Sequence, residues 1–205
     1  MIRFNQIGGP KKASEVAKIP VINAGDGAGE HPTQALLDLY TIWEKHATLN
    51  GLTGLYSGDL LYGRTVHSHL KAFSKFKNNT FYLLSPKSLQ LSRSDFDQFS
   101  ARGLKLVEIE SEKNIPKNAH FWYWTRVQKE RFTNLSEYEK VKSKFVLNKA
   151  LASKYASKKT IFMHPLPRVG EISQDLDSDP RAYYLLKQMK NGLYVRMSLL
   201  SLIFS

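Results

Sequence analysis

The sequence predicts an α/β fold, a three-layer sandwich in which helices cover both faces of a parallel sheet of about five strands. The first observation behind this prediction is that short apolar segments of strand length alternate with segments whose apolar residues recur at helical spacing. Such alternation is typical of parallel strands buried on both faces. The second is a composition of 42% hydrophobic residues, which is ample for a packed core. The expected strands are residues 52–57, 80–84, 104–109, 120–124 and 160–163.

Helices are expected before, between and after these strands. The segments with helical spacing are residues 32–46, 64–76, 92–101, 136–141, 149–156, 183–189 and 194–204. A break is expected near Asn191 and Gly192 in the closing helical region. Residues 1–22 are short and punctuated by Gly and Pro, and we expect no closed domain there, so that the chain starts in the middle of a fold.

Composition excludes several classes of protein. The apolar stretch at residues 193–204 is shorter than the roughly 18 residues that a membrane span needs, and Arg196 interrupts it. No charged-then-apolar leader opens the chain. The absence of Cys excludes disulfides, thiolate metal sites and a Cys nucleophile. A cytoplasmic location is therefore expected, with no membrane partner.

The formal charge of +12 invites a nucleic-acid interpretation. The Lys residues are scattered and form no long block, however, which favours a solvated exterior, an acidic partner or an anionic small substrate. We therefore expect no nucleic-acid partner.

The first candidate motif ends at the start of the expected helix 32–46. Pro32 suits the first helical position, so that His31 becomes the N-cap and Gln34 the third helical residue. The free N–H groups and the positive dipole end there favour an anion or a developing oxyanion. The alternative is a simple cap in which Gln34 bonds back to the chain.

The second motif lies between a strand and a helix. Gly58 and Gly63 allow a tight turn and close approach to a ligand, but they do not form a dinucleotide-binding fingerprint. Arg64 stands at the helix start, where the dipole does not favour a cation, so it is expected either to hold a carboxylate or to be an exposed surface residue.

The third motif leaves the aromatic strand 120–124. In an extended chain Arg126 and Gln128 point to the same side, where a guanidinium and an amide suit one carboxylate. The alternative is a solvated charge run.

The fourth motif, at residues 164–168, carries Pro165 and Pro167, which fix the backbone and remove two donors. The carbonyl groups remain available to a ligand amine; the alternative is a rigid loop, and His164 alone favours a structural role.

Three of these motifs follow expected strands, so they converge on one edge of the sheet. Their residues are cationic and hydrogen-bonding, and no His, Asp or Glu shows metal-ligand spacing. This describes a site that holds anions and stabilises an oxyanion, without a metal or a covalent nucleophile.

These motifs, in order and spacing, resemble the aspartate carbamoyltransferase family. The matching segments are N-A-G-D-G at 23–27, H-P-T-Q-A-L-L-D-L-Y-T-I at 31–42, G-D-L-L-Y-G-R-T-V-H-S at 58–68, T-R-V-Q-K-E-R at 125–131 and H-P-L-P-R-V at 164–169. The resemblance implies a Rossmann-like sheet with bridging helices, and transfer of a carbamoyl group from carbamoyl phosphate to L-aspartate in pyrimidine synthesis without a cofactor.

The resemblance also implies roles for particular residues. His31 would stabilise the carbamoyl oxyanion and Gln34 would contact the carbamoyl amide, while Arg3 resembles a phosphate-contacting arginine. Aspartate would be held by Arg64, Arg126 and Gln128. The backbone of Leu166 and Pro167 would position the attacking amine and the carbamoyl nitrogen.

By the same resemblance the chain divides into a remnant of the carbamoyl phosphate domain (1–31), a bridging helix (32–46), an aspartate-binding domain (47–181) and a C-terminal bridging helix (182–205). The family's S-x-R-T phosphate loop occurs nowhere in the sequence, so this chain alone is expected to be inactive or nearly so. A homotrimer, with or without regulatory chains, is implied for the full-length family. The alternatives are a non-catalytic subunit that binds an amino acid or a partner, and ornithine carbamoyltransferase, whose H-C-L-P motif is absent.

Overall fold

The computed structural model describes residues 1–129, 132, 134–142 and 144–204. A five-stranded sheet with the order β5-β4-β3-β6-β7 lies at its centre, and every neighbouring pair of strands is parallel. The predicted α/β sandwich is therefore confirmed, with each strand starting no more than one residue from its expected position. The strands are β3 (Thr53–Ser57), β4 (Thr80–Leu84), β5 (Lys105–Ile109), β6 (Phe121–Trp124) and β7 (Ile161–Met163).

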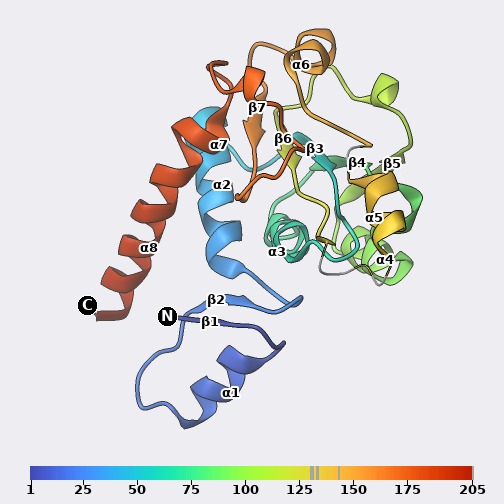
Figure 1. The fold of residues 1–205 in the computed structure, drawn as a ribbon. Coiled ribbons are helices and arrows are strands. Elements are labelled where there is room, and N and C mark those ends of the chain that lie inside the picture. Colours follow the sequence, from blue (N-terminus) through green and yellow to red (C-terminus); the bar gives the residue numbers. More distant parts are fainter. Residues whose placement is uncertain (130–131, 133, 143, 205) are drawn as a thin grey trace.

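Helices alternate with these strands, as Figure 1 shows. They are α2 (Pro32–His46), α3 (Arg64–Phe73), α4 (Arg93–Ala101), α5 (Leu135–Val141), α6 (Lys149–Tyr155), α7 (Tyr183–Leu186) and α8 (Gln188–Phe204), with short 3-10 turns at Lys87–Leu89, Glu112–Asn114 and Gln174–Leu176. No helix in the described part of the chain is both long and apolar enough to cross a bilayer.

The sheet separates two cores, and β6 supplies side chains to both because successive residues of a strand point to opposite faces. Phe121 and Tyr123 pack with aromatic residues and with helices α2, α3 and α4 on one face. Trp122 and Trp124 pack with Phe162 and with α6 and α7 on the other face. All four β6 side chains are fully buried. Apolar strands of this kind cannot be stable unless helices cover both faces, and this is the arrangement that the sequence predicted.

Helices α2 and α8 lie side by side at one flank of the sheet (Figure 1). Both helices expose large apolar side chains to solvent. The exposed residues are Leu36, Tyr40 and Trp43 on α2, and Met189, Leu193, Tyr194, Met197, Leu200, Leu202 and Phe204 on α8. Contiguous exposed apolar surface of this kind marks contact sites.

One local expectation was wrong. The closing helical region breaks at Lys187, and α8 then runs without interruption through Asn191 and Gly192. Both residues serve the contact with α2: Asn191 donates to Thr41 Oγ1 (3.1 Å), and a Cβ at Gly192 would lie only 3.3 Å from Leu37. These residues are therefore explained by helix packing, not by a turn.

The N-terminal segment forms regular structure but no closed domain. Strands β1 (Ile2–Phe4) and β2 (Asn23–Asp26) form a two-stranded parallel sheet, connected by helix α1 (Gly9–Val16). The N–H of Ile2 donates to the carbonyl of Ile22 at 2.8 Å. Arg3 consequently lies within a paired strand that positions its side chain.

Candidate active site

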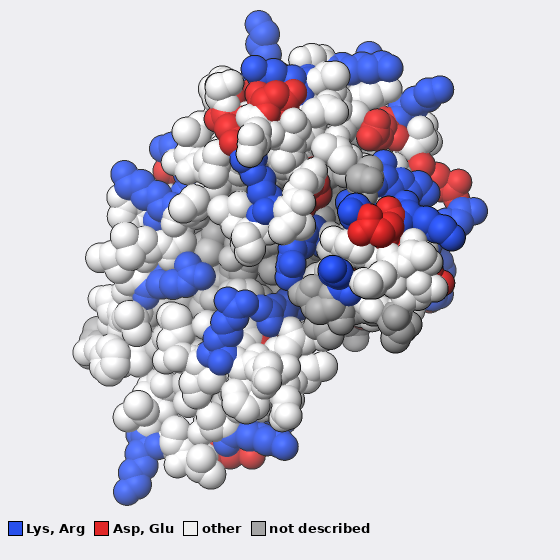
Figure 2. Space-filling model, in the orientation of Figure 1, with Lys and Arg blue, Asp and Glu red and all other residues white. Residues whose placement is uncertain are grey.

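A cavity of about 700 Å³ opens between the small N-terminal sheet, α2, α8 and the carboxyl ends of β3, β6 and β7. Among the charged side chains around the central hollow of this face, Figure 2 shows mostly Lys and Arg. All predicted site residues line this one cavity: Arg3, His31, Gln34, Arg64, Arg126, Gln128, Leu166 and Pro167. The structure thus brings together residues that are far apart in the sequence.

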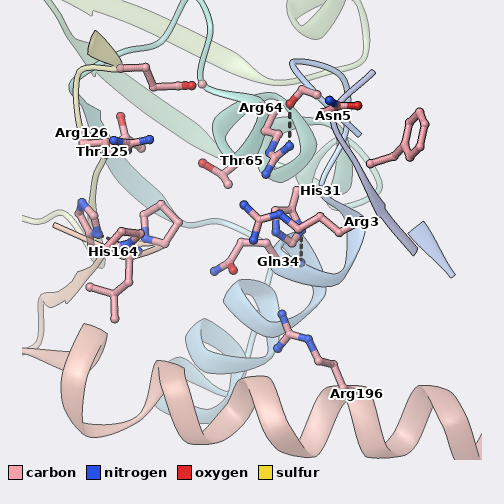
Figure 3. A pocket seen from close by; sticks show the side chains of 17 residues that line it. Arg3, Asn5, His31, Gln34, Arg64, Thr65, Thr125, Arg126, His164 and Arg196 are labelled. Atoms are coloured by element: carbon pink, nitrogen blue, oxygen red, sulfur yellow. Dashed lines mark hydrogen bonds between the residues drawn. The ribbon is translucent and has the colours of Figure 1, made fainter. Parts of the chain in front are cut away.

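The lining residues come from opposite sides of the cavity. Figure 3 shows Arg3, His31 and Arg64 on one side and Arg126 on the other, with Arg196 reaching in from α8. The described lining residues include no Asp or Glu. The cavity therefore has a positive potential, which suits an anionic ligand.

The turn after β3 brings two of the strand ends close together. Gly58 has a φ of +111°, and a Cβ at this position would lie 2.0 Å from the carbonyl oxygen of Thr125. Only glycine permits this approach of the chain that follows β3 to the chain that follows β6. Arg64 and Arg126 are delivered to one cavity by this contact.

His31 is the N-cap of α2, as predicted, and its Nδ1 accepts from the N–H of Gln34 at 3.3 Å. Burial lowers the pKa of His31 to about 4, and the positive charges of Arg64, Arg3 and Arg196 act in the same direction. The ring is therefore neutral at pH 7, and because Nδ1 accepts, the proton lies on Nε2. A neutral donor at a helix N-terminus is suited to a developing oxyanion.

The side chain of Gln34 does not bond back to the chain, so the capping alternative for this residue was wrong. Its Nε2 donates to the buried carboxylate of Asp38 at 2.9 Å. The cap is made by the His31 ring instead.

Arg64 is half-buried, and its Nη1 donates to the carbonyl oxygen of Gly27 at 2.6 Å. The guanidinium thus spans from α3 to the small N-terminal sheet.

On the other side of the cavity, Gln128 donates to the carbonyl of Tyr62 at 3.2 Å, and Arg126 is half-buried. The predicted same-side placement of Arg126 and Gln128 is confirmed; Glu130 and Arg131 of that motif lie outside the described residues.

The loop after β7 is held rigidly. His164 is buried, its Nδ1 accepts from the N–H of Leu166 at 2.8 Å, and its Nε2 lies 2.7 Å from Glu171 Oε1. Leu166 has a φ of +49°, a conformation that residues with side chains rarely adopt, and the Leu166–Pro167 peptide is cis. These contacts support the structural interpretation of His164 and fix the backbone of Leu166 and Pro167 at the cavity.

The motif analysis missed several residues that line the cavity. Arg196 is the most important, since it lies on α8 and its Nη1 donates to the carbonyl of Gly192 at 2.8 Å. The only signal for it was a lone charge inside an apolar stretch. Thr65 and Thr125 were inside motifs but carried no distinctive chemistry. No group of three or more potential metal ligands occurs in the part of the chain that the structure describes.

Comparison with known proteins matches the chain to two family models. Residues 50–203 match the Asp/Orn binding domain of aspartate/ornithine carbamoyltransferase, and residues 1–44 match its carbamoyl-P binding domain. The multifunctional protein pyr1-3 of Dictyostelium discoideum is 48% identical over 203 residues, which is 99% of this chain and 9% of that protein.

Solved structures agree. The catalytic subunit of Methanocaldococcus jannaschii aspartate transcarbamoylase superposes with a TM-score of 0.88 at 43% identity, covering 97% of this chain and 63% of that one. The Trypanosoma cruzi enzyme in complex with carbamoyl phosphate and aspartate gives 0.85 at 36% identity, covering 97% and 64%. This chain thus spans a little under two-thirds of those relatives. It belongs to the aspartate/ornithine carbamoyltransferase family.

Proposed function

We propose that this chain is the aspartate-binding part of an aspartate carbamoyltransferase, which converts carbamoyl phosphate and L-aspartate to N-carbamoyl-L-aspartate and phosphate in pyrimidine synthesis. The observation that supports this proposal is that side chains from separate motifs converge on one cationic cavity. Two further arguments are the names of the relatives and the substrates bound in the T. cruzi structure.

In the proposed reaction the amine of aspartate forms a bond to the carbamoyl carbon, the bond from that carbon to the phosphate oxygen breaks, and the released proton leaves with the phosphate. Charge develops on the carbamoyl oxygen and on the leaving phosphate. Donors that are already in place stabilise such charge without reorganisation. The neutral Nε2–H of His31 is positioned for the carbamoyl oxygen, and Arg3 for the phosphate.

The other substrate carries two carboxylates. We assign these to Arg64 and Arg126, assisted by Gln128, because guanidinium groups bind carboxylates with two parallel hydrogen bonds. The backbone of Leu166 and Pro167 would orient the attacking amine. An ornithine side chain is cationic, and the cluster of arginines at this cavity disfavours it.

Assembly and domain division form part of the same proposal. Helices α2 and α8 would bridge the aspartate-binding domain of residues 47–181 to a carbamoyl phosphate domain, of which residues 1–31 form a part. A homotrimer, with or without regulatory chains, would complete the site. The exposed apolar side chains of α2 and α8 support a packed neighbour of some kind.

The test has a binding step and a turnover step. Calorimetric titration of the 205-residue polypeptide with succinate should show dicarboxylate binding, and single-stranded DNA should not compete with it. Failure to bind any dicarboxylate would contradict the aspartate-site assignment, and competition by DNA would favour a nucleic-acid function.

Turnover by the polypeptide alone should be negligible, because the sequence holds no S-x-R-T phosphate loop. Addition of a folded carbamoyl phosphate domain from a relative should restore carbamoyl-aspartate formation. Unassisted turnover at ordinary enzyme rates, about 1–1000 per second, would show that no such loop is needed. Binding without any restored turnover would favour a non-catalytic subunit.

A further inference from the structure

We propose that Asp38 is a positioning residue, whose buried carboxylate orients the side-chain amides of Gln34 and Gln188 and so fixes the position of Gln34 relative to the loop at residues 164–167. The proposal rests on the proposed function, since its consequence is correct placement of the carbamoyl group. None of the sequence motifs assigned a role to Asp38 or Gln188.

The contacts of Asp38 come from three elements. Its Oδ1 accepts from Gln34 on its own helix at 2.9 Å and from Gln188 Nε2 on α8 at 2.6 Å. Its Oδ2 accepts from the hydroxyl of Tyr123 on β6 at 2.7 Å. Asp38 itself is completely shielded from solvent. A carboxylate buried to this extent is tolerated because three donors surround it.

The carboxylate decides which way each amide faces. At a pH above the raised pKa of Asp38, about 7, the carboxylate is ionised and only accepts, so both glutamines turn their NH₂ groups toward Asp38 and their carbonyl oxygens away from it. For Gln188 the outward oxygen accepts from the backbone N–H of His164 at 3.0 Å, at the start of the rigid loop. For Gln34 the carbonyl oxygen is the amide atom left for a ligand in the cavity that this residue lines.

Gln34 is thereby set as an acceptor, which complements the NH₂ of a carbamoyl group. At the same time Gln188 ties the loop that carries Leu166 and Pro167 to the same carboxylate. One buried charge thus sets the distance between two groups that would hold the carbamoyl nitrogen. Small displacements between such groups have large effects on rate.

Contacts other than those of Asp38 also hold α8 against α2. Asn191 on α8 donates to Thr41 at 3.1 Å and to Glu44 at 3.0 Å, farther along α2 from the cavity. Thr41→Val therefore removes a buried contact between the same two helices without touching Gln34 or Gln188. It is the matched control for a purely structural role.

The decisive variant is Asp38→Asn, which keeps the shape of the side chain but presents a donor to groups that are themselves donors. With the carbamoyl phosphate domain added, KM for carbamoyl phosphate should rise about tenfold, the effect of one misdirected hydrogen bond. KM for aspartate should change much less, and Thr41→Val should change neither KM by more than about twofold. The proposal would be overturned if Asp38→Asn and Thr41→Val changed KM for carbamoyl phosphate equally. It would also be overturned if Asp38→Asn left that KM unchanged.

A second measurement does not depend on turnover. In NMR spectra of the 205-residue chain, the side-chain NH₂ signals of Gln34 and Gln188 should be protected from exchange. Asp38→Asn should change the chemical shifts of both signals and remove their protection from exchange, whereas Thr41→Val should leave the shifts and the protection unchanged. Signals that stay protected in Asp38→Asn contradict the orienting role. If wild type shows the protected signals but no turnover, the proposed function has failed and Asp38 has only a structural role.

If Asp38→Asn does not fold, Gln188→Met serves instead, because it has a similar volume and breaks only the loop side of the network. It should raise KM for carbamoyl phosphate while leaving the Gln34 signal protected. An unchanged KM in this variant would equally count against the proposal.

Discussion

The two sides of the cavity are built differently. On one side, which we call the inner wall, the side chain of Gln34 is held by the buried carboxylate of Asp38, and the ring of His31 accepts from the backbone N–H of Gln34. On the other side, Arg126 and Gln128 follow β6 as half-buried residues, which we call the outer wall. The inner wall is positioned by hydrogen bonds that are shielded from water, whereas the outer wall presents charge to the ligand. Changes to the inner wall should therefore affect stability, and changes to the outer wall should affect chiefly ligand affinity.

The largest expected effect is on the outer wall. Arg126→Ala should weaken succinate binding by about 2–5 kcal/mol, because it removes a charge-assisted pair and leaves the ligand carboxylate without its partner. Calorimetric titration measures the change. Arg93→Ala is the control, since Arg93 pairs with Asp97 on the exposed surface of α4. Equal affinities of wild type and Arg126→Ala would exclude Arg126 from the site.

A change in the inner wall should lower the free energy of unfolding. Tyr123→Phe removes the hydroxyl that donates to Asp38 at 2.7 Å. A hydrogen bond to a charged group contributes roughly 1.5–3 kcal/mol, so the free energy of unfolding in urea, measured above the pKa of Asp38 where the carboxylate is ionised, should fall by about that amount. Succinate affinity should stay close to that of wild type. A large loss of affinity with no loss of stability would show that the two walls are not distinct in this way.

The pH dependence of stability sharpens the same contrast. Burial raises the pKa of Asp38 to about 7, against the opposing effects of Tyr123, Gln188, Gln34 and Arg196. Since an unfolded Asp titrates near pH 4, the folded state binds more protons between about pH 4 and 7, and this contribution to stability decreases as pH rises through that window.

Buried histidines act in the opposite direction, because burial lowers the pKa of both His31 and His46 to about 4. The test is therefore a difference between wild type and Asp38→Asn. Their unfolding free energies should diverge with pH by at most about 1.4 kcal/mol per unit between pH 4 and 7. Parallel curves would mean that Asp38 titrates normally.

The smallest effect is expected for Gln128→Ala. Its amide is neutral and already donates to the backbone of Tyr62, so it only supports the carboxylate contact, and succinate affinity should fall by about 1 kcal/mol, the usual net contribution of one hydrogen bond. Calorimetry at several salt concentrations should also show that this loss is insensitive to salt, unlike that of Arg126→Ala. A salt-dependent loss as large as that of Arg126→Ala would contradict a neutral supporting role.

Much of the fold followed from local patterns. The strand Phe121–Trp124 was predictable because an uninterrupted aromatic segment has no stable place except between two covered faces. The cap at His31 was predictable because Pro32 fixes the first helical position, and the backbone geometry there depends only on neighbouring residues. The position of the closing break was missed, since Asn191 and Gly192 resemble a turn when their packing partner is not known.

The sequence by itself determined the order of strands and helices along the chain, the residues that follow each strand and the positive charge of the site, because these depend on short-range spacing and composition. Only the tertiary structure decided that Arg196 reaches the cavity and that Asp38 receives Gln188 from a helix 150 residues away in the chain. The physical reason is that a buried hydrogen bond between distant segments produces no periodic pattern in the sequence. Its donor and acceptor are recognisable only once folding has removed water from around them.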